Sequence, residues 1–373
     1  MTERTGMTVL VTGAFGNVGR ATVRLLLERG YDVVATDVRS KKSEAGAAAL
    51  ASPRLTVHWV DLRDPAAVDA LVQEVTPTTV IHLAAIIPPI AYAHPGLAKA
   101  VNVEATGHLV EAVSRLASPC RFVFASSIAV YGSRNPHRDE DLSADSPLRP
   151  RDVYGAHKVA AEALVTASPL EWVVLRLGAV MFPTMSFTAD TDSAYLEGLL
   201  PQDARIETVD VRDVATAFVN AVDAPVAGKT LLIGGGEGNR LHLHEVGRSL
   251  VGALGLPGVL AAGRDGDPAD DDAWFVTDWM DTAEAQELLQ FQQHTFADTM
   301  NDLASSVGWK RRLLVLFVPL VKLVLWWRHP LRGSRVTFAP LWSEVEKKWG
   351  AEALSDQPRV PAAGARNVPP TSA

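Results

Sequence analysis

A tyrosine and a lysine four residues apart, Tyr154 and Lys158, are the side chains of this sequence best suited to moving a proton. The alanine-rich stretch that contains them predicts a helix, and a spacing of four places both side chains on one face, one turn apart. A phenol with a pKa of about 10 is a poor base at neutral pH. A nearby ammonium stabilises the phenolate and lowers that pKa by about 1–3 units. The pair therefore indicates acid–base chemistry at a substrate hydroxyl.

Two hydroxyl side chains, Ser126 and Ser127, follow directly after the apolar run Arg121–Ala125, which predicts a buried strand. Ligands bind at the carboxyl ends of the strands in a parallel sheet. A serine there, together with a tyrosine and a lysine, can hold a substrate hydroxyl or carbonyl and move its proton while the carbon faces a nicotinamide. These residues predict hydride transfer to or from a secondary alcohol or its ketone.

A glycine-rich turn provides a place for the nucleotide. The run Thr8–Val11 predicts a strand, Arg20–Arg29 predicts an amphipathic helix, and Gly13, Gly16 and Gly19 lie between them. Glycines in this position turn the chain tightly and let the backbone approach a pyrophosphate. The amino terminus of the helix offers free N–H groups to the phosphates. The arrangement predicts a dinucleotide site.

Acidic residues follow the second and third predicted strands. Asp37 ends the strand Tyr31–Thr36, where a carboxylate accepts hydrogen bonds from an adenosine ribose and repels a 2′-phosphate, which favours NAD over NADP. In the alternative interpretation, Arg39 binds that phosphate. Asp61 is placed to meet the adenine amino group, to cap a helix that begins near Pro65, or to do both.

The alternation of strands and helices predicts an α/β fold, a doubly wound parallel (Rossmann) sheet with helices on both faces. The predicted strands are Thr8–Val11, Asp32–Thr36, Thr56–Trp59, Thr79–Leu83, Arg121–Ala125 and Trp172–Leu177, followed by Ile206–Val211 and Thr230–Ile233. We expect an NAD-binding domain at 1–178 with 206–234 returning to the sheet, a smaller substrate lobe at 179–205 and 235–308, an apolar and basic helical segment at 309–350, and a disordered tail at 351–373.

Composition narrows the class of protein. The chain has 373 residues, 47% of them hydrophobic, and a formal net charge of −8, which argues against a nucleic-acid binder. Its single cysteine, Cys120, excludes an intramolecular disulfide, and no histidines, cysteines or acids have metal-site spacing. The first strand begins close to Met1 without a signal-peptide pattern, so we expect a cytoplasmic protein.

Together these motifs resemble the extended short-chain dehydrogenase/reductase superfamily, in the branch of the NAD-dependent epimerases and dehydratases. The resemblance spans roughly Thr8 to Leu303 and is specific for fold and cofactor rather than for substrate. The matching segments are Thr12–Gly19, Asp61 and Leu62, His82–Ala85, Asn102 and Val103, Ser126 and Ser127, Val130–Gly132, Tyr154–Lys158, Arg176, Val211–Ala215 and Asp281–Leu289.

The resemblance assigns roles residue by residue. It makes Tyr154 the catalytic acid/base and Lys158 its electrostatic partner and a ribose ligand. Ser127, four residues before Tyr131, becomes the catalytic hydroxyl, with Ser126 in support. The implied cofactor contacts are Gly13, Phe15, Gly16, Asn17, Val18, Gly19, Asp37, Asp61, Leu62, Ala84, Ala85, Asn102, Lys158 and Val180.

Two departures from the family pattern bear on the reaction. Ile128 and Ala129 follow Ser127 where dehydratases carry an acidic pair, which argues against elimination of water by that route. Arginines that clamp a sugar diphosphate are also without a clear match, and Arg205, Arg240 and Arg264 are the candidates. The sequence does not distinguish an epimerase from a dehydrogenase.

An apolar and basic segment near the C-terminus stands apart from the acidic remainder. Leu313–Trp327 is apolar except for Lys322 and contains Pro319. As a helix it would extend ~22 Å, short of the ~30 Å hydrocarbon core of a bilayer. No acid lies between Lys310 and Ser343. Its basic residues are Lys310, Arg311, Arg312, Lys322, Arg328, Arg332 and Arg335.

This composition suits peripheral contact with the inner face of a membrane through 309–335, and the alternative is a helix buried in the small lobe or in a homodimer. Membrane contact would favour a sterol- or isoprenoid-type alcohol as substrate. A non-catalytic protein that senses NAD is a further alternative, against which the serine, tyrosine and lysine set argues.

Overall fold

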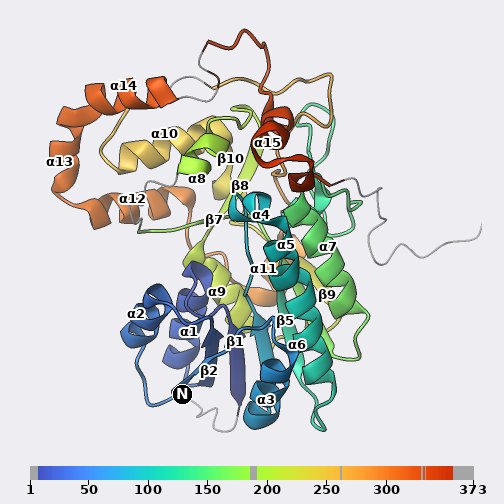
Figure 1. Cartoon of the computed structure of the whole chain (residues 1–373). Helices are drawn as coiled ribbons and strands as arrows, with labels where there is room; N and C mark the ends of the chain where they lie inside the picture. The colour runs from blue at the N-terminus through green and yellow to red at the C-terminus, as the bar shows by residue number, and fades with distance from the viewer. Residues whose placement is uncertain (1–6, 185–190, 261–262, 329–330, 332, 356–373) are drawn as a thin grey trace, which may run out of the picture.

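Seven parallel strands form the central sheet, in the order β3-β2-β1-β4-β5-β6-β9 (Figure 1). The computed structural model describes residues 7–184, 191–260, 263–328, 331 and 333–355. The strands are short apolar runs covered on both faces, as parallel sheets require, and the expected doubly wound fold is confirmed. Their bounds are β1 (Thr8–Thr12), β2 (Asp32–Asp37), β3 (Leu55–Trp59), β4 (Thr79–His82), β5 (Arg121–Ser127), β6 (Glu171–Leu177) and β9 (Lys229–Ile233).

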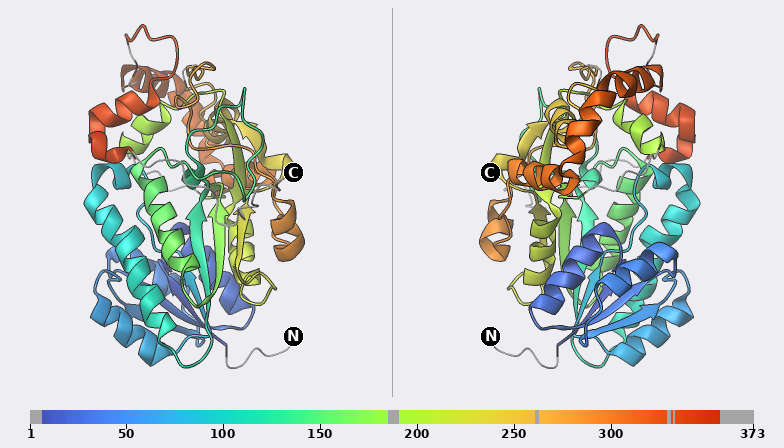
Figure 2. Two further views of the ribbon diagram at one scale, coloured as in Figure 1. Left: turned by 90° about the vertical axis from the view of Figure 1, so that its right-hand side faces the viewer. Right: turned by 90° about the vertical axis from the view of Figure 1, so that its left-hand side faces the viewer.

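Helices cover both faces of this sheet (Figure 2). One face packs against a core that contains Val23, Leu26 and Phe218, and the other against a core that contains Leu109 and Phe122. The first layer consists of α1 (Asn17–Glu28), α9 (Val211–Asn220) and α11 (Ala283–Leu289), with α2 (Lys41–Ala49) beside α1. The second consists of α3 (Pro65–Val75), α6 (Ala105–Ser114) and α7 (Val153–Thr166).

A second, three-stranded sheet in the order β10-β8-β7 organises the smaller lobe. The expectation that 206–234 returns to the main sheet is right for β9 and wrong for β8, whose Ile206 packs against Val246 and Phe296 of this lobe. The elements of the lobe are β7 (Ala179–Met181), α8 (Thr191–Glu197), β8 (Arg205–Asp210), η3 (Glu237–Asn239), β10 (Arg240–His242), α10 (Leu243–Ala253) and α12 (Phe296–Val307).

Short helical segments follow two strands of the sheet, three of them between β4 and α6 and one between β5 and α7. A loop with a cis bond between Pro88 and Pro89 leads from β4 into the first of them. They are α4 (Ile90–Ala93), α5 (Pro95–Lys99), the π-helix η1 (Ala100–Glu104) and the 3₁₀ turn η2 (Ile128–Tyr131).

The C-terminal part of the chain divides into an outer and an inner piece. The outer piece consists of α13 (Lys310–Leu314), η4 (Val315–Phe317) and α14 (Val318–Arg328), which extend along the edge of the small lobe (Figure 1). The inner piece consists of α15 (Leu341–Trp349) and η5 (Ala351–Ala353), whose Leu341, Trp342, Val345 and Ala353 are buried. Within the described residues, no helix combines the length and the apolar composition needed to cross a membrane.

The expected disorder of 351–373 is wrong for its first residues. Leu354 forms an isolated bridge with Asp152, and the Ser355 N–H donates to the Arg151 carbonyl over 3.1 Å. These backbone bonds attach the end of the described chain to the start of α7. Residues 356–373 lie outside the described part of the structure.

Candidate active site

The strand order brings the predicted functional residues to one edge of the sheet. β1 lies between β2 and β4, and β5 follows β4, so their carboxyl ends are neighbours. The glycine turn follows β1, the loop that begins at Leu83 follows β4, and Ser127 ends β5. In open α/β sheets this edge, at the point where the strand order reverses, is where dinucleotides bind.

The glycine turn has the backbone geometry that a pyrophosphate site needs. Gly13 has φ +61°, and a Cβ atom there would lie 2.7 Å from the Ala84 nitrogen. A Cβ atom on Gly19 would collide with the Gly13 carbonyl. Gly16 precedes α1, and no described side chain caps that helix, so its first N–H groups are available to an anion. The turn therefore fits the pyrophosphate of NAD.

Asp37 closes this turn from the side of β2. Its Oδ2 accepts from the Phe15 N–H over 3.0 Å, and its Oδ1 accepts from the Val38 N–H over 2.8 Å. Each carboxylate oxygen has a second lone pair, so acceptor capacity remains for ribose hydroxyls. The Arg39 guanidinium lies 2.7 Å from the Glu44 carboxylate, which occupies it in an ion pair. The geometry favours the NAD interpretation of Asp37 over a 2′-phosphate site at Arg39.

Asp61 pairs with an arginine next to it instead of capping a helix. The Arg63 Nε lies 2.9 Å from Asp61 Oδ1, and this contact with Arg63 lowers the pKa of the Asp61 carboxyl. The helix α3 is capped by Asp64, whose carboxylate accepts from the Ala66 N–H over 3.0 Å. The cap interpretation of Asp61 is therefore wrong, and contact with adenine stays a prediction.

A buried chain of hydrogen bonds braces the loop beside the expected cofactor. Thr12 Oγ1 lies 2.6 Å from His82 Nδ1, and His82 Nε2 lies 3.0 Å from Thr106 Oγ1. The Asn102 amide accepts from the Ile86 N–H over 2.7 Å and donates to its carbonyl over 2.8 Å. Burial, helped by the charge of Lys158, lowers the pKa of His82 to about 3. His82 is thus a neutral structural residue, and Asn102 holds the loop that contains Ala84 and Ala85.

Helix α7, which contains Tyr154 and Lys158, begins where its sequence predicts. The Asp152 carboxylate caps the helix by accepting from the Gly155 N–H over 2.7 Å. Tyr154 is half-buried, and its phenol lies close enough to the Ser127 hydroxyl for that hydroxyl to affect its pKa. Burial raises the pKa of the Tyr154 phenol, the Ser127 hydroxyl beside it lowers that pKa, and the Asp152 carboxylate raises it. The structure therefore brings Ser127 and Tyr154 together.

Lys158 is buried below the tyrosine. Its Nζ donates to the Ala125 carbonyl over 2.6 Å and lies 5.9 Å from the centroid of the Tyr154 ring. Burial lowers the pKa of Lys158 to about 8, and the Glu162 carboxylate opposes that shift. The ammonium therefore stands on the correct face of α7 to favour a phenolate at Tyr154.

A buried ion pair behind Ser127, Tyr154 and Lys158 was not expected from the sequence. Both oxygens of Glu162 are bound by Arg176, at 2.7 and 3.0 Å, and Ser126 donates to the same carboxylate. The other Arg176 nitrogen, Nη1, donates to the Tyr131 hydroxyl over 2.6 Å. Glu162 lies four residues after Lys158, so its position on the same helix face was a usable signal. Ser126 is a supporting residue of this network.

The inner C-terminal piece was also missed as part of the site. The Tyr92 hydroxyl donates to Asp152 over 2.5 Å, and the Trp349 ring of α15 lies 5.6 Å from the Tyr92 ring. Tyr154 packs against the same apolar cluster, which includes Trp342. The spacing of Leu341, Trp342, Val345 and Trp349 is that of one buried helix face and was the signal available.

The candidate arginines for a sugar diphosphate are engaged elsewhere. Arg205 donates to the carbonyls of Pro136 and Asp139 over 2.6 and 3.2 Å. Arg240 donates to Asp141 over 2.9 Å and to the Met280 carbonyl over 2.7 Å.

Two further predicted features can be placed. Arg264 donates to the Ser334 carbonyl over 2.7 Å. Val180, expected beside the nicotinamide, is half-buried in β7. Among the residues that the structure describes, no group of histidines, cysteines and acids could hold a metal ion.

Comparisons with known proteins agree with this geometry. Residues 9–234 match the model of the "NAD dependent epimerase/dehydratase family". The chain is 33% identical over 191 residues to UDP-glucose 4-epimerase 4 of Oryza sativa subsp. japonica, an alignment that covers 46% of this chain and 48% of the relative. It is 34% identical over 165 residues to D-erythronate dehydrogenase of Cupriavidus necator, which covers 43% and 50%. The chain thus spans about half the length of these two relatives.

A solved structure shares the fold. UDP-glucose 4-epimerase of Thermus thermophilus, in complex with NAD, superposes with a TM-score of 0.66 at 24% identity. The match covers 81% of this chain and 99% of that one, and so extends beyond the main sheet into the small lobe.

Proposed function

This chain belongs to the NAD-dependent epimerase/dehydratase family, and from that premise we propose that it transfers hydride between NAD and the carbon of a secondary alcohol or its ketone. Family membership confirms the expected cofactor and class of enzyme. The observation that supports the reaction is the meeting of Ser127 from β5 with Tyr154 and Lys158 from α7, beside the glycine turn.

NAD, when bound, supplies or accepts the hydride. Tyr154 takes the proton of the substrate hydroxyl during oxidation and returns it during reduction. Ser127 hydrogen-bonds the same substrate oxygen and keeps it near the phenol. Because burial raises the pKa of the phenol, Tyr154 carries its proton in the free protein at neutral pH and is ready to act as an acid. The ammonium of Lys158 stabilises the phenolate that forms.

The decisive variant removes only the phenolic oxygen. Tyr154→Phe lowers turnover at least about a hundredfold, the usual scale of acid–base catalysis, and leaves the affinity for NAD unchanged. The matched control is Tyr31→Phe, which removes a hydroxyl bonded to Asp223 at the far side of the sheet and leaves turnover intact. Near-normal turnover in Tyr154→Phe would show that another group moves the proton.

The cofactor preference is tested at Asp37. Calorimetric titration of the full chain is expected to show tighter binding of NAD than of NADP, because the carboxylate repels a 2′-phosphate. In the Asp37→Ala variant, the difference in affinity between NAD and NADP is expected to be smaller. Equal affinities in the unaltered protein would refute this role of Asp37, while the hydride-transfer proposal would still stand.

For the substrate, we favour a polyhydroxy compound without a diphosphate over a sugar nucleotide. The curated relatives include enzymes of both kinds, by their names a UDP-glucose epimerase and an erythronate dehydrogenase. In this chain, however, Arg205 and Arg240 are held by Pro136 and Asp141, in the segment between β5 and α7. Those contacts would have to break before either arginine could bind a diphosphate.

Two assays separate these substrates and also the two reaction types. D-erythronate with NAD is followed by the absorbance of NADH, which a dehydrogenase accumulates. UDP-glucose is followed by chromatography of the sugar products, because an epimerase returns the hydride and accumulates no NADH. Conversion of the UDP-sugar alone would overturn the preferred substrate class and retain the hydride-transfer site.

Cytoplasmic location and a homodimer stay predictions. The comparisons give no support to a sterol-type substrate or to a non-catalytic role.

A further inference from the structure

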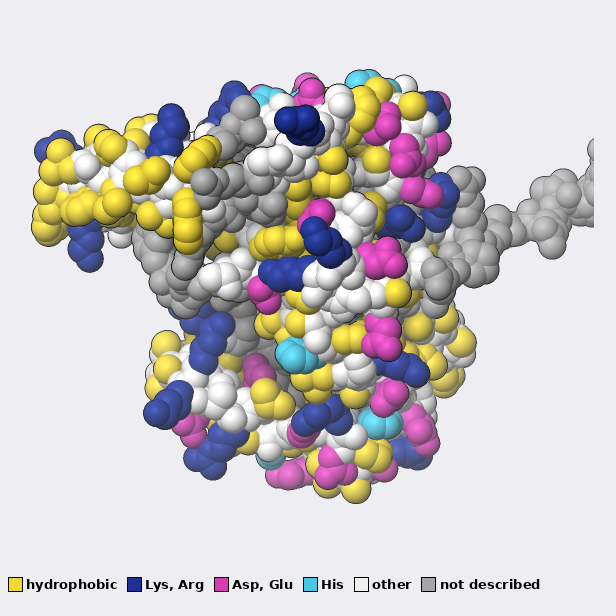
Figure 3. Space-filling model, turned by 45° about the horizontal axis from the view of Figure 1, so that its top comes forward, with side chains coloured by type: hydrophobic (Ala, Val, Ile, Leu, Met, Phe, Trp, Pro, Cys, Tyr) yellow, Lys and Arg dark blue, Asp and Glu magenta, His cyan; other side chains and the backbone are white. Residues whose placement is uncertain are grey.

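The outer C-terminal piece presents apolar side chains to solvent over its whole length. We call residues 309–327 the arm; the structure describes all of them, and none of their side chains is buried. Trp309 is 70% exposed, Leu316 74% and Trp327 67%. In the space-filling view the arm is the protrusion at upper left, where hydrophobic atoms dominate and basic side chains accompany them (Figure 3). Contiguous apolar surface of this kind marks a binding face.

The charge of the arm is of one sign. Lys310, Arg311, Arg312 and Lys322 lie within it, and the sequence contains no acid from Trp309 to Ser343. The chain as a whole carries a net charge of −8, so the negative charge is concentrated elsewhere. A basic surface of this kind attracts anions.

The exposed apolar side chains exceed the single stripe that another helix would cover. Leu320 and Leu323 are three residues apart on α14, whereas Leu313 lies on α13 and Leu316 in the η4 turn, and all four are exposed. Phe317 of η4 and Trp326 of α14 are also exposed, each by 52%. Such a broad apolar surface, with tryptophan and basic residues beside it, suits a helix that lies in the interfacial plane of a bilayer.

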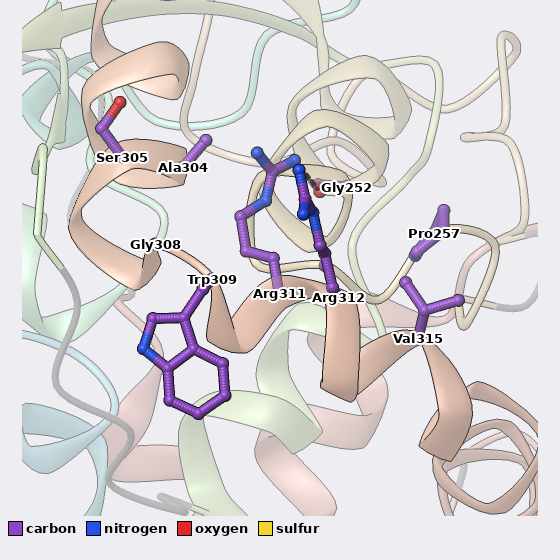
Figure 4. A pocket seen from close by; sticks show the side chains of 10 residues that line it. Gly252, Pro257, Ala304, Ser305, Gly308, Trp309, Arg311, Arg312 and Val315 are labelled. Atoms are coloured by element: carbon purple, nitrogen blue, oxygen red, sulfur yellow. Dashed lines mark hydrogen bonds between the residues drawn. The ribbon is translucent and has the colours of Figure 1, made fainter.

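A pocket at the base of the arm is lined by two of its basic residues, Arg311 and Arg312. It has a volume of about 610 Å³ and lies between α10, α12 and α13. Figure 4 shows the guanidinium ends of Arg311 and Arg312 pointing in the same direction, toward Gly252. Arg311 Nη2 donates to the Gly252 carbonyl over 3.1 Å, whereas its buried Nε has no hydrogen-bond partner among the described residues. Two adjacent guanidinium groups match the oxygens of a phosphate.

We propose that the arm docks on a phospholipid bilayer with anionic headgroups, lies along its interface, and places one headgroup phosphate between Arg311 and Arg312. The apolar side chains supply insertion that salt does not weaken, and the basic side chains supply attraction that salt screens. The proposal rests on the arm alone and not on the catalytic site, so either can fail without the other.

The competing occupant is a second copy of this chain. Its acidic body would attract the arm, and its surface would cover the exposed apolar side chains. Charged residues are depleted from the centres of protein interfaces, however, and Lys322 interrupts the apolar run of the arm. The lipid surface accommodates that side chain because lysine can extend its ammonium to the headgroups.

Co-sedimentation of the full chain with vesicles tests the proposal. One set consists of phosphatidylcholine and the other of an equal mixture of phosphatidylcholine and phosphatidylglycerol. The protein is expected to pellet with the mixed vesicles at low salt and to be only partly released at high salt. Protein that remains in the supernatant with the mixed vesicles at low salt would overturn the proposal. Sedimentation velocity of that protein would then show whether it is a dimer.

Paired variants assign the binding to the arm. Lys310→Gln with Lys322→Gln removes two charges, each worth about 1 kcal/mol at an anionic surface, and lowers partitioning about thirtyfold. The matched control, Arg24→Gln with Lys42→Gln, changes the net charge equally on exposed helices of the main domain and leaves partitioning unchanged. Equal losses in both pairs would refute a localised arm.

A second pair tests the apolar surface. Leu316→Ser with Leu320→Ser is expected to abolish the fraction that stays bound at high salt. Leu164→Ser, at a leucine of α7 that is 40% exposed, is expected to leave that fraction unchanged. Retention of salt-resistant binding in the arm variant would refute insertion. NAD binding by each variant checks that it is folded.

The phosphate pocket has its own readout. Vesicles in which oleate replaces phosphatidylglycerol carry a carboxylate in place of a phosphate. The intact chain is expected to prefer the phosphate-bearing vesicles at equal surface charge, and Arg311→Gln with Arg312→Gln is expected to remove that preference. Equal binding of the intact chain to both vesicles would refute the pocket as a headgroup site.

Discussion

Helix α7, with its proposed catalytic residues, and the arm differ from an ordinary protein surface in opposite ways. Around α7, charged side chains are buried: Lys158, Glu162 and Arg176 are each at most 5% exposed. In the arm, large apolar side chains such as Leu316 and Trp327 are exposed. Burial of a charge and exposure of an apolar surface both cost free energy, so each region needs a compensating partner.

The two regions differ in where that partner lies. The charges around α7 find it inside the chain, because Arg176 binds both oxygens of Glu162 and Lys158 bonds the Ala125 carbonyl. In the arm, by contrast, the structure leaves large apolar side chains mostly in contact with solvent, Leu316 by 74% and Trp327 by 67%. A self-contained polar core supports chemistry at a fixed geometry, whereas an uncovered apolar arm points to an external surface.

The largest expected effect comes from breaking the buried ion pair. Arg176→Met leaves the Glu162 carboxylate buried without its partner, which typically costs about 3–5 kcal/mol in the free energy of unfolding. Chemical denaturation of the variant measures that loss. The double variant Arg176→Met with Glu162→Gln is expected to lose less, because the unpaired charge is gone. A loss below about 1 kcal/mol in the single variant would show that water reaches this carboxylate.

The next effect concerns His82 and acid. Its pKa is about 3 in the folded protein, against an ordinary value near 6.5, so the unfolded chain binds the additional proton as the pH falls from 6.5 toward 3. Stability therefore decreases over that window, by about 2–3 kcal/mol at pH 4.5 from this residue. His82→Gln flattens the decrease, whereas His94→Gln, at an exposed histidine, leaves it unchanged. Identical pH profiles for both variants would contradict the burial of a neutral His82.

Lys158 is expected to lower the stability of the folded protein at neutral pH while it supports turnover. Its folded pKa is about 8 against an ordinary value near 10.5, so the unfolded chain holds more protons between pH 8 and 10.5. Stability from this residue rises with pH across that window, and below it the buried ammonium remains a cost. Lys158→Met is therefore expected to gain about 2 kcal/mol at neutral pH while losing turnover. A less stable variant at neutral pH would show that the bond to Ala125 outweighs the desolvation.

The sequence predicted the parts of the fold and site that are encoded locally. The strand runs, the glycine turn and the four-residue spacing of Tyr154 and Lys158 each depend on a few neighbouring residues. The structure places these elements as expected. The sequence suggested Asp61 as a helix cap, whereas Asp64, three residues later, caps α3. Both residues are acids shortly before Pro65, so the pattern alone did not separate them.

Features that depend on distant pairing were not predictable in the same way. The apolar pattern of β8 would be the same in either sheet. Only its pairing with β7 and β10 shows that it belongs to the three-stranded sheet. The contact of Trp349 with Tyr92 joins residues far apart in the chain. From the sequence alone, α15 was therefore grouped with the apolar segment that precedes it.

The smallest expected effect is a stability change near zero in the arm. Leu316→Ser removes an apolar side chain that is 74% exposed, so folding buries little of it and the free energy of unfolding changes by less than about 0.5 kcal/mol. Leu109→Ala, in the buried core between α6 and the sheet, is the contrast and is expected to cost about 2–5 kcal/mol. Denaturation of both variants without lipid measures the difference. A loss of several kcal/mol in Leu316→Ser would mean that the arm is covered in the protein in solution, by the body or by a second copy, and its apolar surface would then not be free to meet a bilayer.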